Sequence, residues 1–167
     1  MEFVLRDWQV ADAESLAKQA NNPRIANNLR NIFPHPYTLA DAEWYINDCM
    51  KADQKKQCIK AIVVDGKAVG SIGIIIKTDV ACKSAELGYW LGEDFWGQRI
   101  ITRAIRQMCD LAFAEYELVR IFAEPYAYNI GSQKALENAG FKLEGRLQKS
   151  IYKNGNFFDS YIYGLVE

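Results

Sequence analysis

Three arginines and a glycine lie close together in the stretch from Ser84 to Arg106. Gly97 stands in a short turn, and Arg99, Arg103 and Arg106 fall in the first turns of a predicted helix. The start of a helix already carries partial positive charge, so each arginine there is unfavourable by roughly 0.3–1 kcal/mol unless an anion offsets it. The free N–H groups of a first helical turn also bind anions. This combination predicts a phosphate site; three solvated arginines on an exposed helix face are the alternative.

The residues on either side of the turn must position such a site. Glu86–Leu91 alternates and carries aromatic side chains, as a half-buried strand does. After the turn, apolar residues recur every three or four positions, which is typical of an amphipathic helix. These residues are Ile101, Ala104, Ile105, Met108 and Ala112. Strand, glycine-bearing turn and helix form a layout that directs backbone N–H groups at an anion.

The composition predicts one soluble domain over residues 1–167. A chain of 167 residues can bury a sizeable core, and 50% hydrophobic with 25% charged residues is ordinary for a globular protein. The net charge of −1 predicts no bulk attraction to nucleic acid or to an anionic membrane. The 4 cysteines form no C-x-x-C pair, so neither a metal site nor a disulfide framework is predicted, and free thiols fit a cytoplasmic location. We expect no signal peptide and no membrane span.

The other segments predict a mixed sheet with helices on both faces. Strands are predicted at 3–6, 58–64, 68–76, 118–124, 141–144, 148–152 and 157–166. Further helices are predicted at 13–20, 24–29, 39–50 and 130–139. Asp12 and Asn129 are expected to cap helices, Thr38 and Asp41 to form a capping box, and Gly140 to end a helix. The pair Asp65-Gly66 predicts a type I′ hairpin turn, because both of its central residues need positive φ.

Four motifs together carry a family resemblance. They are Phe33-Pro34-His35-Pro36-Tyr37-Thr38, Ala85-Glu86-Leu87-Gly88-Tyr89-Trp90-Leu91, Phe95-Trp96-Gly97-Gln98, and the run from Asn129 through Ser132 to Gly140-Phe141. Over essentially its whole length the chain resembles the GNAT superfamily of acyl-coenzyme A-dependent N-acetyltransferases, in the RimJ/RimL-type branch. The resemblance implies an α/β GNAT fold with a twisted mixed sheet of about seven strands. It also implies acetyl-coenzyme A between a splayed parallel strand pair, Glu86–Leu91 and Leu118–Glu124.

The resemblance further implies which residues bind the coenzyme. They are Trp90, Leu91, Gly97, Gln98, Arg99, Ile100, Ile101, Thr102, Asn129 and Ser132. The family turn follows Gln/Arg-x-x-Gly-x-Gly/Ala, and here its three specified places hold Trp96, Arg99 and Ile101. Arg99 in place of glycine is the main departure. If the turn requires positive φ, a non-glycine residue costs about 1 kcal/mol, which the Arg99 side chain could offset by pairing with a phosphate. A weakened coenzyme site is equally consistent with this residue.

Acetyl transfer from a thioester to an amine needs a base, a donor to the oxyanion and an acid for the leaving thiolate. Glu86 is the predicted base, directly or through a water, because it lies on the strand expected to border the coenzyme; an exposed strand carboxylate is the alternative. A backbone N–H of the same strand is expected to hold the oxyanion. The resemblance places Asn129 on the coenzyme arm and Ser132 near the sulfur, with Tyr126 and Tyr128 as further acids. The alternative is a structural role for both residues, with Asn129 as a helix cap and Ser132 as a residue of the first helical turn.

The acceptor side is predicted from aromatic residues that could equally belong to the core. They are Phe33, His35, Tyr37 and Trp44. The chain is therefore predicted to be a cytoplasmic acetyl-coenzyme A-dependent N-acetyltransferase that acts by direct transfer in a ternary complex, without a metal. The acceptor would be a primary amine, either a protein N-terminus or a small molecule, and the chain a monomer or homodimer. A non-catalytic acyl-coenzyme A-binding domain on the same fold is the alternative.

Overall fold

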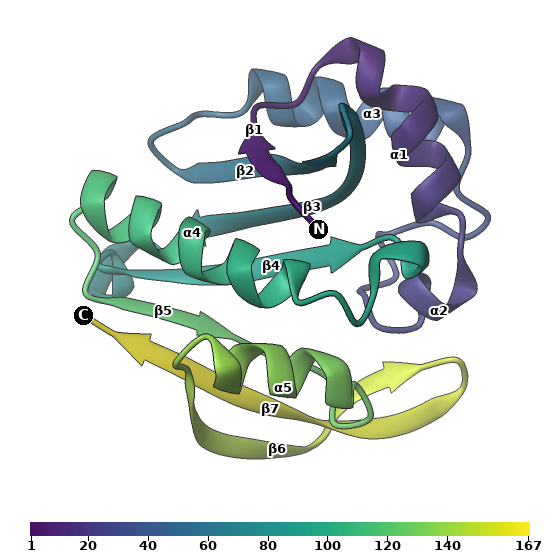
Figure 1. The fold of residues 1–167 in the computed structure, drawn as a ribbon. Coiled ribbons are helices and arrows are strands. Elements are labelled where there is room, and N and C mark those ends of the chain that lie inside the picture. Colours follow the sequence, from purple (N-terminus) through teal and green to yellow (C-terminus); the bar gives the residue numbers. More distant parts are fainter.

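The computed structural model describes residues 1–167 and contains one seven-stranded sheet (Figure 1). Its strand order is β1-β2-β3-β4-β5-β7-β6. The strands are β1 (Val4–Arg6), β2 (Gln57–Val64), β3 (Lys67–Ile76), β4 (Ser84–Leu91), β5 (Arg120–Ala123), β6 (Lys142–Lys153) and β7 (Asn156–Val166). β4 and β5 run parallel, and every other neighbouring pair is antiparallel. The predicted mixed sheet with one parallel pair is confirmed.

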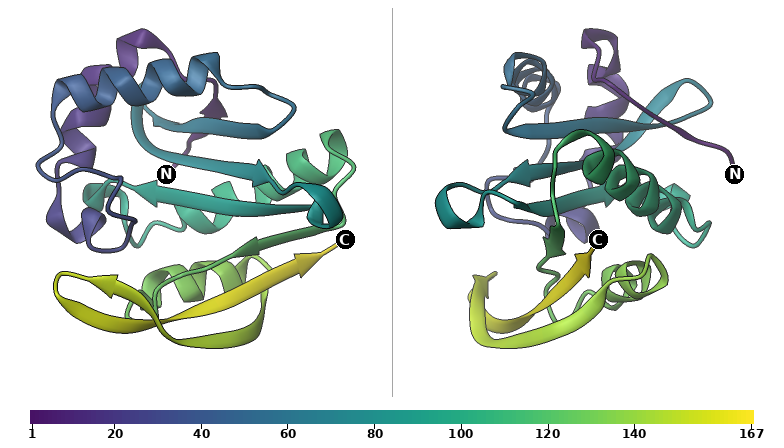
Figure 2. Two further views of the ribbon diagram at one scale, coloured as in Figure 1. Left: turned by 180° about the vertical axis from the view of Figure 1, so that it is seen from behind. Right: turned by 90° about the vertical axis from the view of Figure 1, so that its left-hand side faces the viewer.

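The helices cover both faces of this sheet. They are α1 (Ala13–Ala20), α2 (Pro23–Ala26), α3 (Leu39–Lys51), α4 (Ile100–Glu115) and α5 (Ile130–Asn138), with 3-10 turns η1 (Val10–Asp12), η2 (Asp79–Ala81) and η3 (Glu93–Phe95). Successive side chains of a strand point to opposite faces. On β2, Ile62 and Val64 enter the core under α4 and α5, while Ala61 and Val63 enter the core under α1 and α3. The edge-on view in Figure 2 shows α4 and α5 together on one side of the sheet. None of the helices is long and apolar enough to cross a membrane.

Local sequence signals position most of these elements as predicted. Thr38 Oγ1 accepts from the N–H of Asp41 at 3.2 Å, and Asp41 Oδ2 accepts from the N–H of Thr38 at 2.8 Å, so a capping box starts α3. Asp65 and Gly66 have φ of 47° and 77°, as the type I′ turn requires. Gly140 ends α5 with φ of 101°.

Two segments differ from the prediction. α2 ends at Ala26 instead of Leu29, so residues 27 to 38 form a loop before α3. The two strands expected at 141–144 and 148–152 are one strand, β6, whose register with β7 shifts twice. Lys149 lies at one of these irregularities with φ of 50°. An irregularity of this kind interrupts the alternation of side chains, which is why the sequence reads as two strands.

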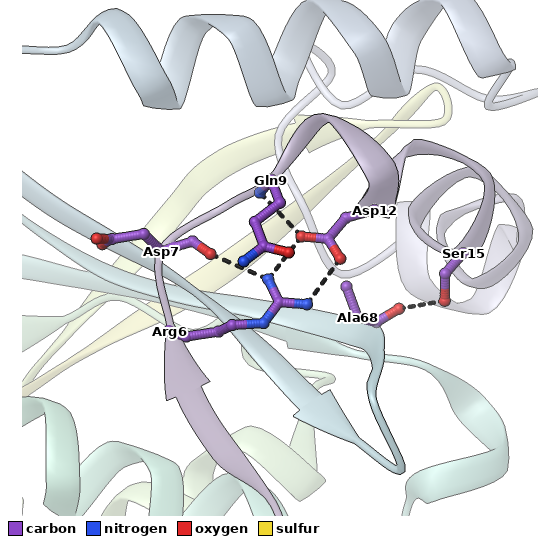
Figure 3. A network of polar contacts seen from close by, with 6 residues as sticks. All are labelled: Arg6, Asp7, Gln9, Asp12, Ser15 and Ala68. Carbon is purple, nitrogen blue, oxygen red and sulfur yellow. Dashed lines mark hydrogen bonds and ion pairs between the residues drawn. The ribbon is translucent and has the colours of Figure 1, made fainter.

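Asp12 does not cap α1, and this corrects the predicted role of its side chain. Its backbone is already helical, with φ of −77° and ψ of −11°, and its side chain makes no capping hydrogen bond to α1. The buried carboxylate instead accepts from both terminal nitrogens of Arg6, at 2.7 and 2.8 Å, and from the N–H of Gln9 at 2.9 Å (Figure 3). Nearby, Ser15 Oγ donates to the carbonyl of Ala68 at 2.6 Å, which fastens α1 to β3. Asp12 therefore joins β1 to the start of the helical layer.

We expect D12N to lower the free energy of unfolding by about 2–3 kcal/mol at neutral pH, because it weakens a buried charge-assisted pair. Burial by itself raises the pKa of Asp12, but hydrogen bonds from Arg6 and Gln9 outweigh burial, so the pKa lies below its ordinary value. A lowered folded-state pKa means that this stabilisation is present above the unfolded pKa of about 4 and is lost as the pH falls through the folded value. The free energies of unfolding of wild type and variant, measured in urea, should therefore differ at neutral pH and converge in acid.

The exposed Asp7 offers the control for this prediction. D7N should change the free energy of unfolding by less than about 1 kcal/mol, and an equal loss in both variants would contradict the prediction.

Candidate active site

A cleft opens where β4 and β5 separate. The two strands pair only between Ser84–Glu86 and Arg120–Phe122, and beyond these residues they diverge. A cavity of about 830 Å³ lies between them. The N-terminal ends of α4 and α5 and the loop after α2 complete its walls. This volume suits a large organic ligand, since pockets for such molecules span roughly 300–1,000 Å³.

The turn before α4 presents unpaired backbone N–H groups to this cleft. Gly97 has φ of 74°, and Arg99, the residue that precedes the helix, has φ of 59°. No side chain caps the helix, and the N–H of Arg103 is the first to find a helical acceptor, the carbonyl of Arg99 at 3.2 Å. The N–H groups from Gly97 to Thr102 have no backbone partner, as at any uncapped helix start. Such a set of donors, with the positive end of the helix dipole behind it, binds phosphate groups.

A tryptophan and an ion pair hold the turn in place. Trp96 donates from Nε1 to the carbonyl of Leu91 at 2.8 Å, which ties the turn to the end of β4. The guanidinium of Arg24 lies 5.2 Å from the centre of the Trp96 ring and forms an ion pair with Glu93. The turn is therefore fixed by contacts that do not involve its own N–H groups.

Arg99 lies in the left-handed region, so its conformation costs about 1 kcal/mol relative to glycine. We expect R99G to raise the free energy of unfolding by about 0.5–1 kcal/mol, because glycine adopts this φ without strain but has a more flexible unfolded chain. R99A removes the same side chain and keeps the strain, so thermal unfolding of the two variants separates the two effects. If the arginine side chain also binds a phosphate, both variants will bind acetyl-coenzyme A more weakly. A melting temperature no higher in R99G than in R99A would show that the residue is not strained.

The other two arginines of the predicted cluster do not reach the cleft. Arg103 donates to the carbonyl of Met1 at 2.9 Å and forms an ion pair with Glu2 at 3.2 Å. Arg106 donates to the carbonyl of Asn138 at the end of α5. Both side chains are bound to other parts of the chain and neither lines the cleft, which corrects the prediction that all three arginines offset one anion. Arg99 lines the cleft, and so does Lys134 on α5.

Two carboxylates line the cleft without a cationic partner. Glu86 is the last residue of β4 that pairs with β5, opposite Phe122. Glu124 directly follows the end of β5, two positions after Phe122, and lies close enough to Glu86 for the two charges to interact. Neither carboxylate makes a hydrogen bond or an ion pair, and both line the cavity. Burial and the nearby charge of Glu86 raise the pKa of Glu124 above its ordinary value. A positive group placed between these carboxylates would be strongly attracted.

A hydroxyl pair lies at the start of α5. The side chain of Asn129 accepts from the N–H of Ser132 at 3.2 Å, so Asn129 is a helix N-cap as expected. The hydroxyl oxygens of Ser132 and Tyr89 are 2.6 Å apart, and both residues line the cleft. Of the alternative acids, Tyr128 donates to the carbonyl of Asn27, while the Tyr126 hydroxyl makes no hydrogen bond within the chain. Both tyrosines also line the cleft.

The predicted coenzyme residues all line the cleft except Gln98, whose side chain donates to the carbonyl of Asp94 at 3.3 Å. The predicted acceptor residues do not line it. Phe33 and Tyr37 pack together with ring centres 5.0 Å apart and belong to the core under α1 and α3. Trp44, on α3, is 64% exposed, and His35 is exposed in the same loop as Phe33.

The loop after α2 supplies different residues to the cleft, namely Asn28, Leu29 and Arg30. Lys153 at the end of β6 holds this loop in place, because its buried Nζ donates to the carbonyl of Leu29 at 2.7 Å and to Asn31 Oδ1 at 3.0 Å. Burial lowers the pKa of Lys153. The last hairpin therefore supports this loop, and Ile151 of β6 also lines the cleft.

Comparison with known proteins agrees with this architecture. The family described as "Acetyltransferase (GNAT) domain" matches residues 2–142. The putative ribosomal N-acetyltransferase YdaF of Bacillus subtilis (strain 168) is 34% identical over 170 residues, which cover 99% of this chain and 91% of that protein. The probable N-acetyltransferase YjcK of the same organism is 33% identical over 169 residues, which cover 98% of this chain and 93% of that protein.

Solved structures share the whole fold. The microcin C7 self-immunity acetyltransferase MccE, solved in complex with acetyl-CoA and AMP, is 28% identical with a TM-score of 0.86, and the match covers 99% of this chain and 93% of that one. The ribosomal L7/L12 alpha-N-protein acetyltransferase RimL, solved with coenzyme A, has the same fold at 18% identity, with a TM-score of 0.87 over 98% of this chain and 93% of that one. The chain has the splayed strand pair and an uncapped turn before α4, and it belongs to the GNAT superfamily of acetyltransferases, in the RimJ/RimL-type branch.

Proposed function

We propose that the protein transfers the acetyl group of acetyl-coenzyme A directly to a primary amine within a ternary complex. The observation that supports this most is that one cavity is lined by three kinds of group that the reaction needs. These are the unpaired N–H groups of the turn before α4, the two free carboxylates on β4 and directly after β5, and the hydroxyl pair at the start of α5. The coenzyme, when bound, supplies an activated acetyl thioester.

The residues present fit acetyl-coenzyme A. Its pyrophosphate would be held by the N–H groups from Gly97 to Thr102, with Arg99 and Lys134 as nearby cations. Beyond Glu86, β4 has no β5 neighbour, so its free edge can form hydrogen bonds with an extended amide-containing arm. The free edge also leaves a backbone N–H, expected near Leu91, to stabilise the oxyanion.

Glu86 would act as the base. An ammonium group cannot attack a carbonyl carbon, so the carboxylate of Glu86 removes one proton, directly or through a water. Glu124 would hold the ammonium beside Glu86 before this transfer, because its carboxylate faces the same space. The C–N bond then forms and the C–S bond breaks. In total the acceptor nitrogen loses two protons, one to Glu86 and one that ends on the leaving sulfur.

Ser132 would donate a hydrogen bond, and then a proton, to that sulfur, and would recover a proton from the acceptor nitrogen. The side chain of Asn129 fixes the first turn on which Ser132 stands. The acceptor would be the N-terminal amine of a protein or a small primary amine, in the cytoplasm, where the coenzyme is available. RimL is described as a ribosomal-protein α-N-acetyltransferase, and YdaF as a putative ribosomal one, which favours a protein N-terminus.

Calorimetric titration with acetyl-coenzyme A tests this proposal first. We expect micromolar affinity that falls for an analogue without the pyrophosphate, followed by release of free thiol in the presence of amine acceptors. Absence of binding at millimolar concentration would contradict the proposal. Tight binding without thiol release from any of a wide set of peptides and small amines would favour the non-catalytic coenzyme-binding alternative.

A further inference from the structure

We propose that Tyr89 is a positioning residue that orients the Ser132 hydroxyl toward the sulfur of the coenzyme. The inference rests on the proposed role of Ser132 and goes beyond it. It starts from a contact between two separate parts of the fold. Tyr89 comes from β4, Ser132 comes from the first turn of α5, and their hydroxyl oxygens are 2.6 Å apart at the wall of the cleft.

The direction of this hydrogen bond follows from what each hydroxyl can reach. The only other acceptor near the Tyr89 hydroxyl is the carbonyl oxygen of Ser132, at 3.5 Å, which is too far for a strong hydrogen bond. A phenol is also a more acidic donor than a serine hydroxyl. Tyr89 therefore donates to Ser132 Oγ, and the hydrogen of Ser132 is left free to point into the cleft.

The surroundings keep Tyr89 in this donor form. Burial raises the pKa of Tyr89 well above its ordinary value, so the phenol stays protonated at physiological pH. Without this bond, the Ser132 hydroxyl would be free to turn back and donate to a carbonyl three or four residues earlier, as serines on helices often do. The contact thus selects the one Ser132 rotamer that faces the cleft.

A double-mutant cycle on kcat separates positioning from a general structural effect. We expect S132A to lower kcat by about 10²-fold and Y89F by about 10-fold, with the double variant no slower than S132A alone. Independent contributions would instead multiply, to about 10³-fold in the double variant. A multiplied effect, or full activity in Y89F, would overturn the role of Tyr89. Full activity in S132A would overturn the proposed role of Ser132 itself.

A binding measurement tests the same contact without turnover. Calorimetry with coenzyme A and with desulfo-coenzyme A compares ligands with and without the sulfur. We expect wild type to prefer coenzyme A by about two- to fivefold, and this preference to vanish in S132A and equally in Y89F. A preference retained in Y89F but lost in S132A would also overturn the inference.

The chain contains a matched control. Tyr45 is likewise a partly buried tyrosine whose hydroxyl contacts a serine, Ser71, at 2.8 Å, on the opposite face of the sheet. Y45F removes the same hydroxyl and leaves a comparable serine without its partner. It should lower thermal stability about as much as Y89F does, with no change in kcat or in the preference for coenzyme A. If Y45F reduced both quantities as Y89F does, the effect of Tyr89 would be one of stability alone.

Discussion

E86Q is expected to lower kcat by about 10²-fold or more, while the dissociation constant of acetyl-coenzyme A stays unchanged. Glutamine has the shape of glutamate but cannot remove a proton from the acceptor ammonium. Glu86 makes no hydrogen bond or ion pair within the chain, so its loss should not disturb the fold. Steady-state kinetics with a saturating coenzyme, together with calorimetry, give the two quantities separately.

Two further variants make this prediction specific. Glu43, exposed on α3 and outside the cleft, undergoes the same loss of charge in E43Q, which should leave kcat unchanged. Glu124 shares the cleft with Glu86, and E124Q should mainly raise the KM of the amine, because it removes one of two carboxylates that attract the ammonium. If E86Q kept its activity while E124Q lost kcat, the base would be Glu124.

The sequence was informative where local chemistry decides the structure. The capping box at Thr38, the Asp65-Gly66 turn and the Asn129 cap each depend on residues within three positions of one another, and all are present. Because side chains alternate along β4, Glu86 and Tyr89 lie on opposite faces of the sheet. The turn and α4 could therefore be predicted from local pattern, whereas the splayed strand pair and the residues expected to bind the coenzyme came from the family resemblance.

The parts that sequence reasoning missed depend on contacts between distant segments. Tyr89 and Ser132 are hydrogen-bonded although they lie 43 positions apart in the sequence, and Lys153 is hydrogen-bonded to Leu29, which lies 124 positions away. No local sequence pattern predicts a contact between residues so far apart. Glu124 could have been predicted if the register of β4 and β5 were known, because the pairing of Glu86 with Phe122 brings Glu124 close to Glu86. The sequence alone does not give this register. The predicted Asp12 cap was wrong for a different reason, since the guanidinium of Arg6, only 6 positions away, competes for the carboxylate.

T102E is expected to weaken the binding of acetyl-coenzyme A by about 10²-fold and to leave the protein at least as stable as wild type. Thr102 is the third residue of α4 and lines the cleft beside the unpaired N–H groups. A carboxylate in the first turn of a helix stabilises it by roughly 0.3–1 kcal/mol. The same charge would lie near the pyrophosphate, and two like charges about 5 Å apart repel by about 3 kcal/mol at an effective dielectric constant of 20. T102Q has nearly the same size without the charge and should bind the coenzyme within a few-fold of wild type.

The opposite signs of the two effects are what make T102E informative about the turn. A variant that merely disturbs the helix would lose both stability and affinity for the coenzyme. In T102E the carboxylate takes the place of the phosphate at the positive end of the helix dipole, so the variant gains stability and loses affinity. Because the affected charges lie at a partly exposed site, the loss of affinity should also shrink as salt is raised. Affinity in T102E equal to that of T102Q would place the pyrophosphate away from α4, and Arg99 would then have no phosphate to offset the strain of its backbone.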